Sequence, residues 1–290
     1  MKTAVVTVVH GRSAHLRRQL QGFHLSTVRP EFHVIVAISD DDIAAVVAAD
    51  DGCAELIAVA GSPDRLPIAA ARNLGADTAI AHGAELLVFL DVDCIAGPTL
   101  IARYRCAAAD ARHGAALLNG PVTYLPPPGQ NGYDLAGLEM LVSPHQGRPA
   151  PPDGVIVEGT EYEYFWSLSF AVTVPTWRRI GGFCTLYTGY GAEDTDFAQI
   201  AASQSIGMRW VGGAHAFHQY HPVSDPPVEH VADILRNGEI FHRRWGWWPM
   251  RGWLDQFATR GLIEWRNGCP VAATNVGRTH RSRGGGSASS

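Results

Sequence analysis

The sequence predicts an α/β protein with a Rossmann-like, mostly parallel sheet flanked by helices. Apolar, β-branched runs alternate with segments of helical periodicity, and each run stops at a cluster of polar residues. The run at residues 86–90 is apolar throughout, as in a strand that is buried on both faces. Strands that alternate with helices imply crossover connections, and these connections favour a doubly wound parallel sheet.

The first part of the chain carries these signals in regular order. Residues 3–9 predict a strand that ends in a glycine turn, and residues 14–24 predict the helix that follows it. The later elements are expected as strands at residues 32–38, 55–60, 86–90 and 115–123, and as helices at residues 43–49, 68–82 and 99–112. Polar residues therefore follow several strand ends, which is where open parallel sheets bind their ligands.

The second part of the chain is less regular. Proline and glycine are dense at residues 125–129 and 144–154, a composition typical of loops that cover a cleft. Strands are expected at residues 165–174 and 208–212, with a helix at residues 197–205. Two helices within residues 227–266 flank a block with Trp245, Trp247 and Trp248, which favours packing over the stacking of a sugar ring.

Composition excludes several classes of protein. A formal net charge of -5 argues against a nucleic-acid partner, because such proteins usually present a basic face. No apolar stretch reaches the roughly 18 residues of a membrane span, and the first residues lack a signal peptide's pattern. The five cysteines show no C-x-x-C spacing, which indicates reduced thiols. We therefore expect a soluble cytoplasmic protein without a membrane span.

Two carboxylates, Asp91 and Asp93, follow the central strand and are separated by one residue. Side chains alternate along a strand, so we expect both to point the same way. Neighbouring carboxylates repel each other, and a divalent cation between them would remove that cost. The alternative is that one caps the next helix while the other is solvated.

A second acidic cluster, Glu193, Asp194 and Asp196, lies in a glycine-rich turn before a helix. Helix capping explains one of these residues. The two remaining carboxylates suggest a site that binds hydroxyl groups, in which one carboxylate deprotonates an attacking hydroxyl.

Three histidines, His215, His218 and His221, recur at intervals of three. On a helix they would share one face and suit a metal, but Pro222 and the preceding glycines favour a loop. In a loop, one or two of them could join Asp93 on one ion.

Together these features resemble GT-A glycosyltransferases related to family 2, with a second half similar to the galactosyltransferase-type C-terminal region. The resemblance covers residues 3 to about 221. It rests on the order of several short motifs: Thr7-Val8-Val9-His10-Gly11-Arg12, the acidic end of the second strand, Ala71-Arg72-Asn73-Leu74-Gly75, Asp91-Val92-Asp93, Gly181-Gly182-Phe183 and Gly191-Ala192-Glu193-Asp194.

The resemblance implies a role for each matched residue. Nucleotide binding is implied for Thr7, His10, Arg12, Asp40, Arg72 and Asp91. Binding of Mn²⁺ or Mg²⁺ is implied for Asp93 and His218, with His215 as the second choice among the histidines. Asp194 would be the catalytic base of an inverting enzyme, and the acceptor would contact Trp166, Tyr190, Gly191 and Glu193. The Asp-Asp-Gly-Ser expected after the second strand is Ser39-Asp40-Asp41-Asp42 here, which leaves the base contact open.

The predicted activity is transfer of a hexose from a nucleoside diphosphate sugar, GDP-mannose or a UDP-hexose, to a hydroxyl of a saccharide or glycoside, as in polysaccharide biosynthesis. Residues 1–123 would bind the nucleotide sugar, residues 124–226 the acceptor, residues 227–270 would form a helical extension, and residues 271–290 a flexible tail. The alternatives are a sugar-nucleotide nucleotidyltransferase and a non-catalytic saccharide-binding module.

Overall fold

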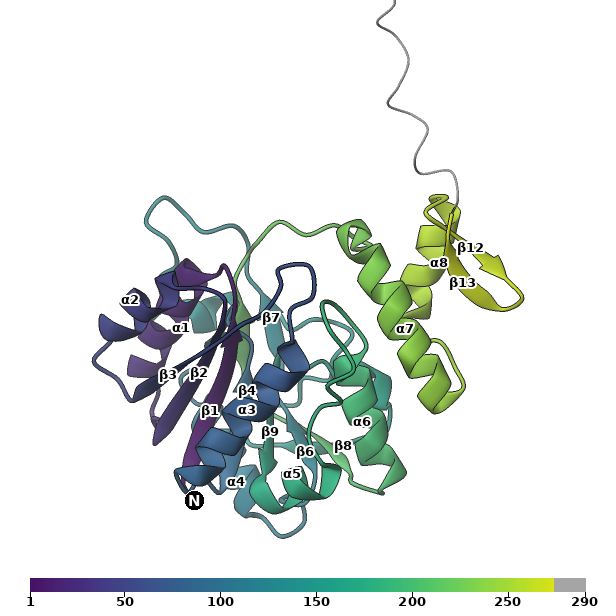
Figure 1. The fold of residues 1–290 in the computed structure, drawn as a ribbon. Coiled ribbons are helices and arrows are strands. Elements are labelled where there is room, and N and C mark those ends of the chain that lie inside the picture. The colour runs from purple at the N-terminus through teal and green to yellow at the C-terminus, as the bar shows by residue number, and fades with distance from the viewer. Residues whose placement is uncertain (274–290) are drawn as a thin grey trace, which may run out of the picture. The chain divides into compact units, whose positions relative to one another are not determined.

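The computed structural model describes residues 1–273 and divides the chain into two compact units (Figure 1). The first unit comprises residues 1–189 and 193–222, and the second contains residues 190–192 and the described residues 223–273. Most of the predicted flexible tail, from residue 274 onward, lies outside the described residues. Within residues 1–273, no helix combines the length and apolar character that crossing a bilayer requires.

An eight-stranded sheet forms the centre of the first unit, in the order β3-β2-β1-β4-β9-β6-β10-β8. β1, β2, β3 and β4 pair in parallel, while β9 and β8 run antiparallel to their neighbours, so the predicted mostly parallel sheet is confirmed. The segments that follow β1, β2 and β4 therefore meet at one edge. The strands are β1 (Thr3–Val9), β2 (Phe32–Ile38), β3 (Ala54–Val59), β4 (Leu86–Leu90), β6 (Leu117–Asn119), β8 (Ile156–Gly159), β9 (Ser169–Thr173) and β10 (Met208–Val211).

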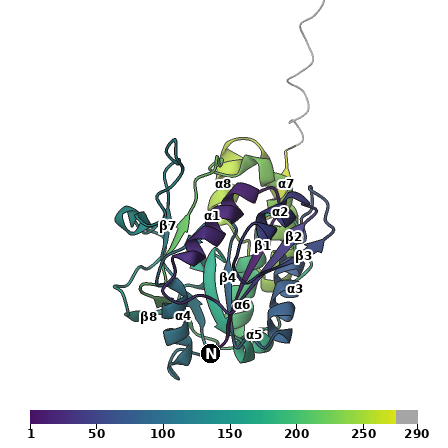
Figure 2. The same cartoon turned by 90° about the vertical axis from the view of Figure 1, so that its left-hand side faces the viewer.

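Helices cover both faces of this sheet (Figure 2). On one face Leu16 of α1 packs with Val9 and Ile35, whereas on the other Ala76 of α3 packs with Val6. The two faces differ because neighbouring residues of a strand point to opposite sides. One face carries α1 (Ser13–His24), α2 (Asp42–Ala48) and α4 (Leu100–Ala109); the other carries α3 (Ile68–Ala81), α5 (Val174–Ile180) and α6 (Glu193–Ser203).

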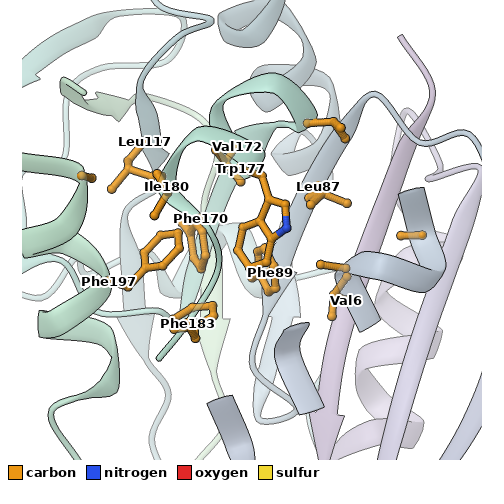
Figure 3. Packing of buried hydrophobic residues seen from close by; sticks show 14 of the residues in the cluster. Val6, Leu87, Phe89, Leu117, Phe170, Val172, Trp177, Ile180, Phe183 and Phe197 are labelled. Atoms are coloured by element: carbon orange, nitrogen blue, oxygen red, sulfur yellow. The ribbon is translucent and has the colours of Figure 1, made fainter. Parts of the chain in front are cut away.

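Aromatic rings join α5 and α6 to the centre of the sheet (Figure 3). The ring centroids of Phe89 and Phe170 lie 4.7 Å apart, and those of Phe183 and Phe197 lie 4.4 Å apart. Trp177 contacts both pairs. Such large buried rings contribute strongly to stability, and here they hold the start of α6 close to the end of β4.

The predicted strand at residues 115–123 is two strands, β6 and β7 (Val122–Tyr124), separated at Gly120 and Pro121. A Cβ on Gly120 would lie only 1.8 Å from the carbonyl oxygen of Ala214, so the chain passes a second segment too closely for a side chain. β7 then leaves the main sheet and joins a three-stranded sheet, β5-β11-β7, with β5 (Cys94–Ala96) and β11 (Ala216–His218). Register places His218 opposite Cys94 and Tyr124.

The second unit is built from helices and a hairpin. The two predicted helices are α7 (Val231–Trp245) and α8 (Arg251–Thr259), and the hairpin of β12 (Ile263–Arg266) and β13 (Cys269–Ala272) was not predicted. The ring of Trp248 stacks on His242 with centroids 4.5 Å apart, and its Nε1 donates to the carbonyl of Gly268 at 3.0 Å. The packing interpretation of the tryptophan block is thereby favoured.

Short 3-10 turns complete the fold at Leu138–Leu141, Tyr162–Tyr164 and Val228–His230.

Candidate active site

Asp91 and Asp93 lie in the turn between β4 and β5, because β4 ends at Leu90. The backbone N–H of Cys94 donates to the carbonyl of Asp91 at 2.8 Å and closes this turn. Strand alternation therefore does not orient the two carboxylates, and that premise of the sequence analysis was wrong. Each carboxylate has partners of its own.

A buried hydrogen-bond network supports the turn from inside the protein. The Nε2 of Gln19 donates to the carbonyls of Asp91 and Cys94, at 2.8 and 2.9 Å. Thr7 Oγ1 lies 3.0 Å from Gln19 Oε1 and 3.0 Å from His33 Nε2, and burial lowers the pKa of His33 to about 4. Thr7 itself has no exposed surface. We infer that Thr7, predicted to contact the nucleotide, instead positions the carboxylate turn.

Arg72 of α3 joins the two acidic clusters. Its Nη2 donates to Asp91 Oδ1 at 2.9 Å, and its Nη1 donates to Glu193 Oε1 at 3.1 Å. The guanidinium also lies over the ring of Phe183, 5.2 Å from the centroid. Burial alone would lower the pKa of Arg72, but Asp91 and Glu193 raise it above its ordinary value. Segments more than 100 residues apart in sequence are thus held at one edge of the sheet.

The motif around Arg72 has a second structural task. Asn73 Nδ2 donates to the carbonyl of Phe183, and the backbone N–H of Phe183 donates to Asn73 Oδ1, both at 2.8 Å. Gly182 has a φ of +80°, and a Cβ there would lie 2.8 Å from Asn73 Oδ1. The two short motifs that contain Asn73 and Gly182 are therefore complementary parts of one contact.

The carboxylates of the second cluster have different environments. Glu193 is paired with Arg72, while Asp196 is fully buried and accepts a hydrogen bond from the hydroxyl of Tyr187 at 3.1 Å. Asp194 Oδ1 accepts the backbone N–H of Thr195 at 2.7 Å, and Asp194 has no ion-pair partner among residues 1–273. Burial of Asp194 raises its pKa to about 7, and the charge of Glu193 contributes to that increase. A carboxylate with such a pKa suits proton transfer near neutral pH.

Asp93, His218 and His221 form a group that could hold a metal ion. Asp93 Oδ1 lies 3.5 Å from His218 Nε2, and Asp93 Oδ2 lies 3.3 Å from His221 Nε2. Burial alone would raise the pKa of Asp93, but His221 and His218 lower it. Asp93 Oδ1 is buried and accepts no hydrogen bond from a described residue. An orphaned carboxylate oxygen beside two imidazoles fits a divalent cation.

His215, the second predicted histidine ligand, lies outside this group, and that assignment needs correction. Its Nε2 lies 2.7 Å from Thr123 Oγ1, and burial lowers its pKa to about 4. The reason is the extended backbone at β11, because residues three apart on a strand point to opposite sides. His221 lies in the loop after β11 and contacts Asp93 instead.

The predicted nucleotide-binding residues at the first two strand ends lie close together. Asp40 Oδ2 accepts the backbone N–H of Gly11 at 2.6 Å, and His10 Nδ1 lies 2.7 Å from the carbonyl of Ile38. The positive charge of Arg12 acts on Asp93. β1, β2 and the metal-ligand group therefore share one edge of the sheet.

The predicted acceptor residues are divided between the two units. Trp166 belongs to the first unit and lies edge-on to His145, with ring centroids 5.2 Å apart. Tyr190 and Gly191 belong to the second unit, where Tyr190 stacks on His230 with centroids 4.4 Å apart. Only Trp166 and Glu193 are therefore placed within the same unit as Asp194.

Several residues at the site were not singled out from the sequence. Gln19 and His33 belong to no recognisable motif. Their role depends on contacts with Thr7 that form only in the folded chain. Tyr124 stacks on His218, with ring centroids 4.5 Å apart. Its position directly after a predicted strand could have drawn attention to it. Arg148 lies in a proline-rich loop and is almost fully buried, which no local pattern indicated.

Comparisons with known proteins agree with the predicted fold. A family model described as the N-terminal domain of galactosyltransferase matches residues 158–222, the segment that contains Asp194 and His218. No curated protein matches the chain.

Solved structures match over most of the chain. GalNAc-T7, crystallised with UDP, GalNAc and Mn²⁺, has a TM-score of 0.54 and 14% identity, covering 80% of this chain and 47% of that one. Residues 1–349 of S. aureus TarS, in complex with UDP-GlcNAc, have a TM-score of 0.57 and 12% identity, covering 88% of this chain and 76% of that one. The chain thus spans about half the length of the GalNAc-T7 chain. Likeness at these identities concerns the fold and confirms the prediction made for it.

Proposed function

We propose that this chain, which has the GT-A glycosyltransferase fold, transfers a hexose from a nucleoside diphosphate sugar to a hydroxyl of a saccharide or glycoside with the help of a divalent metal ion. The observation that carries the proposal is the double ion pair of Arg72. Through Asp91 and Glu193 it joins the turn that contains Asp93 to the first turn of α6, which contains Asp194.

The donor binds at the edge formed by β1, β2 and β4. Asp93, His218 and His221 would hold the metal, and two imidazoles with one carboxylate favour Mn²⁺ over Mg²⁺. When bound, the metal supplies positive charge to the diphosphate of the leaving nucleotide. We propose UDP as the nucleotide, because two similar structures were solved with UDP or UDP-GlcNAc. Arg12 and Asp40 are the proposed contacts to the nucleotide.

The acceptor hydroxyl loses its proton to Asp194. A base must accept a proton in its ionised form, and a pKa of about 7 makes Asp194 both ionised and basic at slightly alkaline pH. Arg72 holds Glu193 in place beside it. Direct attack by the deprotonated hydroxyl inverts the configuration at the anomeric carbon, so we propose an inverting enzyme. Trp166, in the same unit as Asp194, remains a proposed acceptor contact.

Thermal unfolding with a panel of nucleotides tests the donor assignment. UDP should raise the melting temperature in the presence of Mn²⁺, because a ligand at 100 times its Kd stabilises the folded state by about 2.7 kcal/mol. Asp93→Ala should lose the part of this shift that depends on Mn²⁺, whereas Asp77→Ala, at an exposed position on α3, should keep it. A larger shift with GDP than with UDP would reassign the base.

Product analysis tests the reaction class. Incubation with UDP-hexoses, Mn²⁺ and a panel of saccharides should release UDP, and Asp194→Asn should not release it. Release of pyrophosphate from UTP and a hexose 1-phosphate would indicate a nucleotidyltransferase instead. An absence of both reactions and of any nucleotide-dependent stabilisation would contradict the proposal and favour a saccharide-binding module.

A further inference from the structure

Arg148 is a buried positive charge that forms no ion pair with an acidic residue among residues 1–273. The residue is 3% exposed, and the only hydrogen bond from its side chain to a described residue runs from Nη1 to the carbonyl of Trp166, at 3.0 Å. Its Nε and Nη2 are buried and lack a hydrogen-bond partner among residues 1–273. Buried charges are normally paired, because desolvation of an ion costs several kcal/mol. A charge retained at such a cost indicates a role beyond stability.

The two nitrogens without partners form the edge of the guanidinium that binds carboxylates elsewhere in this chain. Arg103 uses Nε and Nη2 to hold the two oxygens of Asp153, and Arg112 uses the same pair on Asp110. This two-pronged arrangement matches the planar geometry of a carboxylate or a phosphate. Arg148 presents the same Nε–Nη2 edge, and neither nitrogen is bound to a described residue.

The guanidinium of Arg148 is held in a fixed orientation. It lies 5.0 Å from the ring centroid of Trp210 and 5.8 Å from that of Trp166, in addition to its hydrogen bond to the Trp166 carbonyl. Such cation–π contacts stabilise the charge without using the N–H donors of the free edge. A pre-oriented donor pair binds an anion with little loss of side-chain entropy.

A series of rings connects the metal-ligand group to Arg148. The ring centroids of His218 and Tyr124 lie 4.5 Å apart, those of Tyr124 and His145 lie 5.5 Å apart, and those of His145 and Trp166 lie 5.2 Å apart. Trp166 then contacts Arg148. Arg148 thus lies three rings beyond the metal ligand His218, on the side that carries the predicted acceptor residue Trp166.

A pocket of about 370 Å³ adjoins Arg148. Its walls include the aromatic rings of Tyr164 and Trp210 and the carboxylates of Glu158 and Glu161, and Glu158 is paired with Arg209. Rings can stack on a sugar, and carboxylates can accept hydrogen bonds from its hydroxyls.

We propose that Arg148 determines acceptor specificity by binding the carboxylate or phosphate of an anionic saccharide. This inference rests on the proposed transferase function, since it names the class of acceptor for the same site. The anionic group receives two N–H donors from Arg148, and the sugar ring occupies the adjoining pocket.

Thermal unfolding with sugars that differ only in charge tests the inference. In the presence of UDP and Mn²⁺, glucuronate or glucose 6-phosphate should raise the melting temperature, and neutral glucose at equal ionic strength should not. The two anionic sugars distinguish a carboxylate from a phosphate ligand. Arg148→Met should lose this shift, whereas Arg112→Met, at an exposed arginine already paired with Asp110, should keep it. Arg148→Lys keeps the charge without the paired donors and should weaken binding about tenfold, the cost of one charged hydrogen bond.

The unliganded variants separate binding from structural support. Without sugar, Arg148→Met should be at least as stable as the wild type, because it replaces an unpaired buried charge with an apolar chain. A purely structural role predicts a lower melting temperature together with an unchanged response of Arg148→Lys to the anionic sugars, and that result would overturn the proposal. A wild type that responds to UDP and Mn²⁺ but to neither anionic sugar would refute this inference alone. A wild type without any response to UDP would refute the proposed function.

Discussion

Replacement of Asp194 by Asn should remove activity and, at alkaline pH, increase stability. Asp194 has a pKa of about 7 in the folded protein, raised by burial from the ordinary value of 3.8. The folded state therefore prefers the protonated form, and ionisation of the carboxylate opposes folding. This destabilisation is absent below pH 4, grows as the pH rises, and is complete above pH 7. An amide cannot ionise, so the Asp194→Asn variant does not have this pH-dependent destabilisation.

The size of the effect follows from the two pKa values. A rise from 3.8 to about 7 corresponds to about 4 kcal/mol at full ionisation. Asp194 keeps some exposed surface, and solvent screening reduces the effect, so we expect a gain of about 1 to 2 kcal/mol at pH 8.5. Loss of a general base should lower kcat by about 100-fold to 10,000-fold. The wild-type kcat should reach half its maximum near pH 7.

Denaturant unfolding without metal at pH 4 and pH 8.5, combined with a pH profile of UDP release, measures both quantities. The gain in free energy of unfolding should be present for Asp194→Asn at pH 8.5 and absent at pH 4. Asp77→Asn, which replaces an exposed carboxylate on α3, should leave stability and kcat unchanged. A pH-independent stability change in Asp194→Asn, together with more than a tenth of the wild-type kcat, would refute the reasoning.

Three further changes test other parts of the site. His221→Ala should weaken Mn²⁺ binding at least about tenfold, whereas His215→Ala should retain it, as measured by calorimetric titration; equal losses would contradict the revised ligand set. Arg72→Lys should lower kcat/KM about 100-fold without unfolding the chain, because an ammonium group cannot hold both carboxylates in the same planar geometry; steady-state kinetics with near-normal values would show that the double ion pair is dispensable. Gly182→Ala should reduce the free energy of unfolding by about 1 to 3 kcal/mol, since its φ is +80° and its Cβ would crowd Asn73; a neutral result in denaturant unfolding would mean that the contact relaxes easily.

Short motifs predicted the site best where their chemistry is local. Asp91, Asp93 and Asp194 follow strand or turn signals that can be recognised in the sequence, and the structure places the first two at the end of β4. The order of the motifs also predicted the GT-A fold, which the structural comparisons confirm. In contrast, the histidines could not be assigned from spacing alone. His221, not His215, lies beside Asp93. Residues three apart lie on the same face of a helix but on opposite sides of a strand, and β11 is a strand.

Partners distant in sequence required the folded chain. Arg72 was predicted to contact a nucleotide, but its two ion pairs depend on the packing of α3 and α6 against the same face of the sheet. Thr7 was assigned to the same role by the family resemblance, and its burial with Gln19 and His33 indicates a supporting role. No local sequence pattern singles out Arg148. It stands out in the structure because it is buried without a nearby carboxylate among the described residues.

Local patterns were thus sufficient for β1 to β4, β9 and β10, most helices and the acidic residues at the strand ends, since hydrophobic periodicity and turn chemistry act over a few neighbouring residues. The short strands β5, β8 and β11 and the β12–β13 hairpin were not predicted. Only the tertiary structure decided which carboxylates pair with Arg72, which histidines lie beside Asp93, and that the buried Arg148 has no carboxylate partner among residues 1–273. These properties depend on burial and on contacts between segments that lie far apart in the chain. Burial changes the free energy of a charge by several kcal/mol, and no local pattern encodes it.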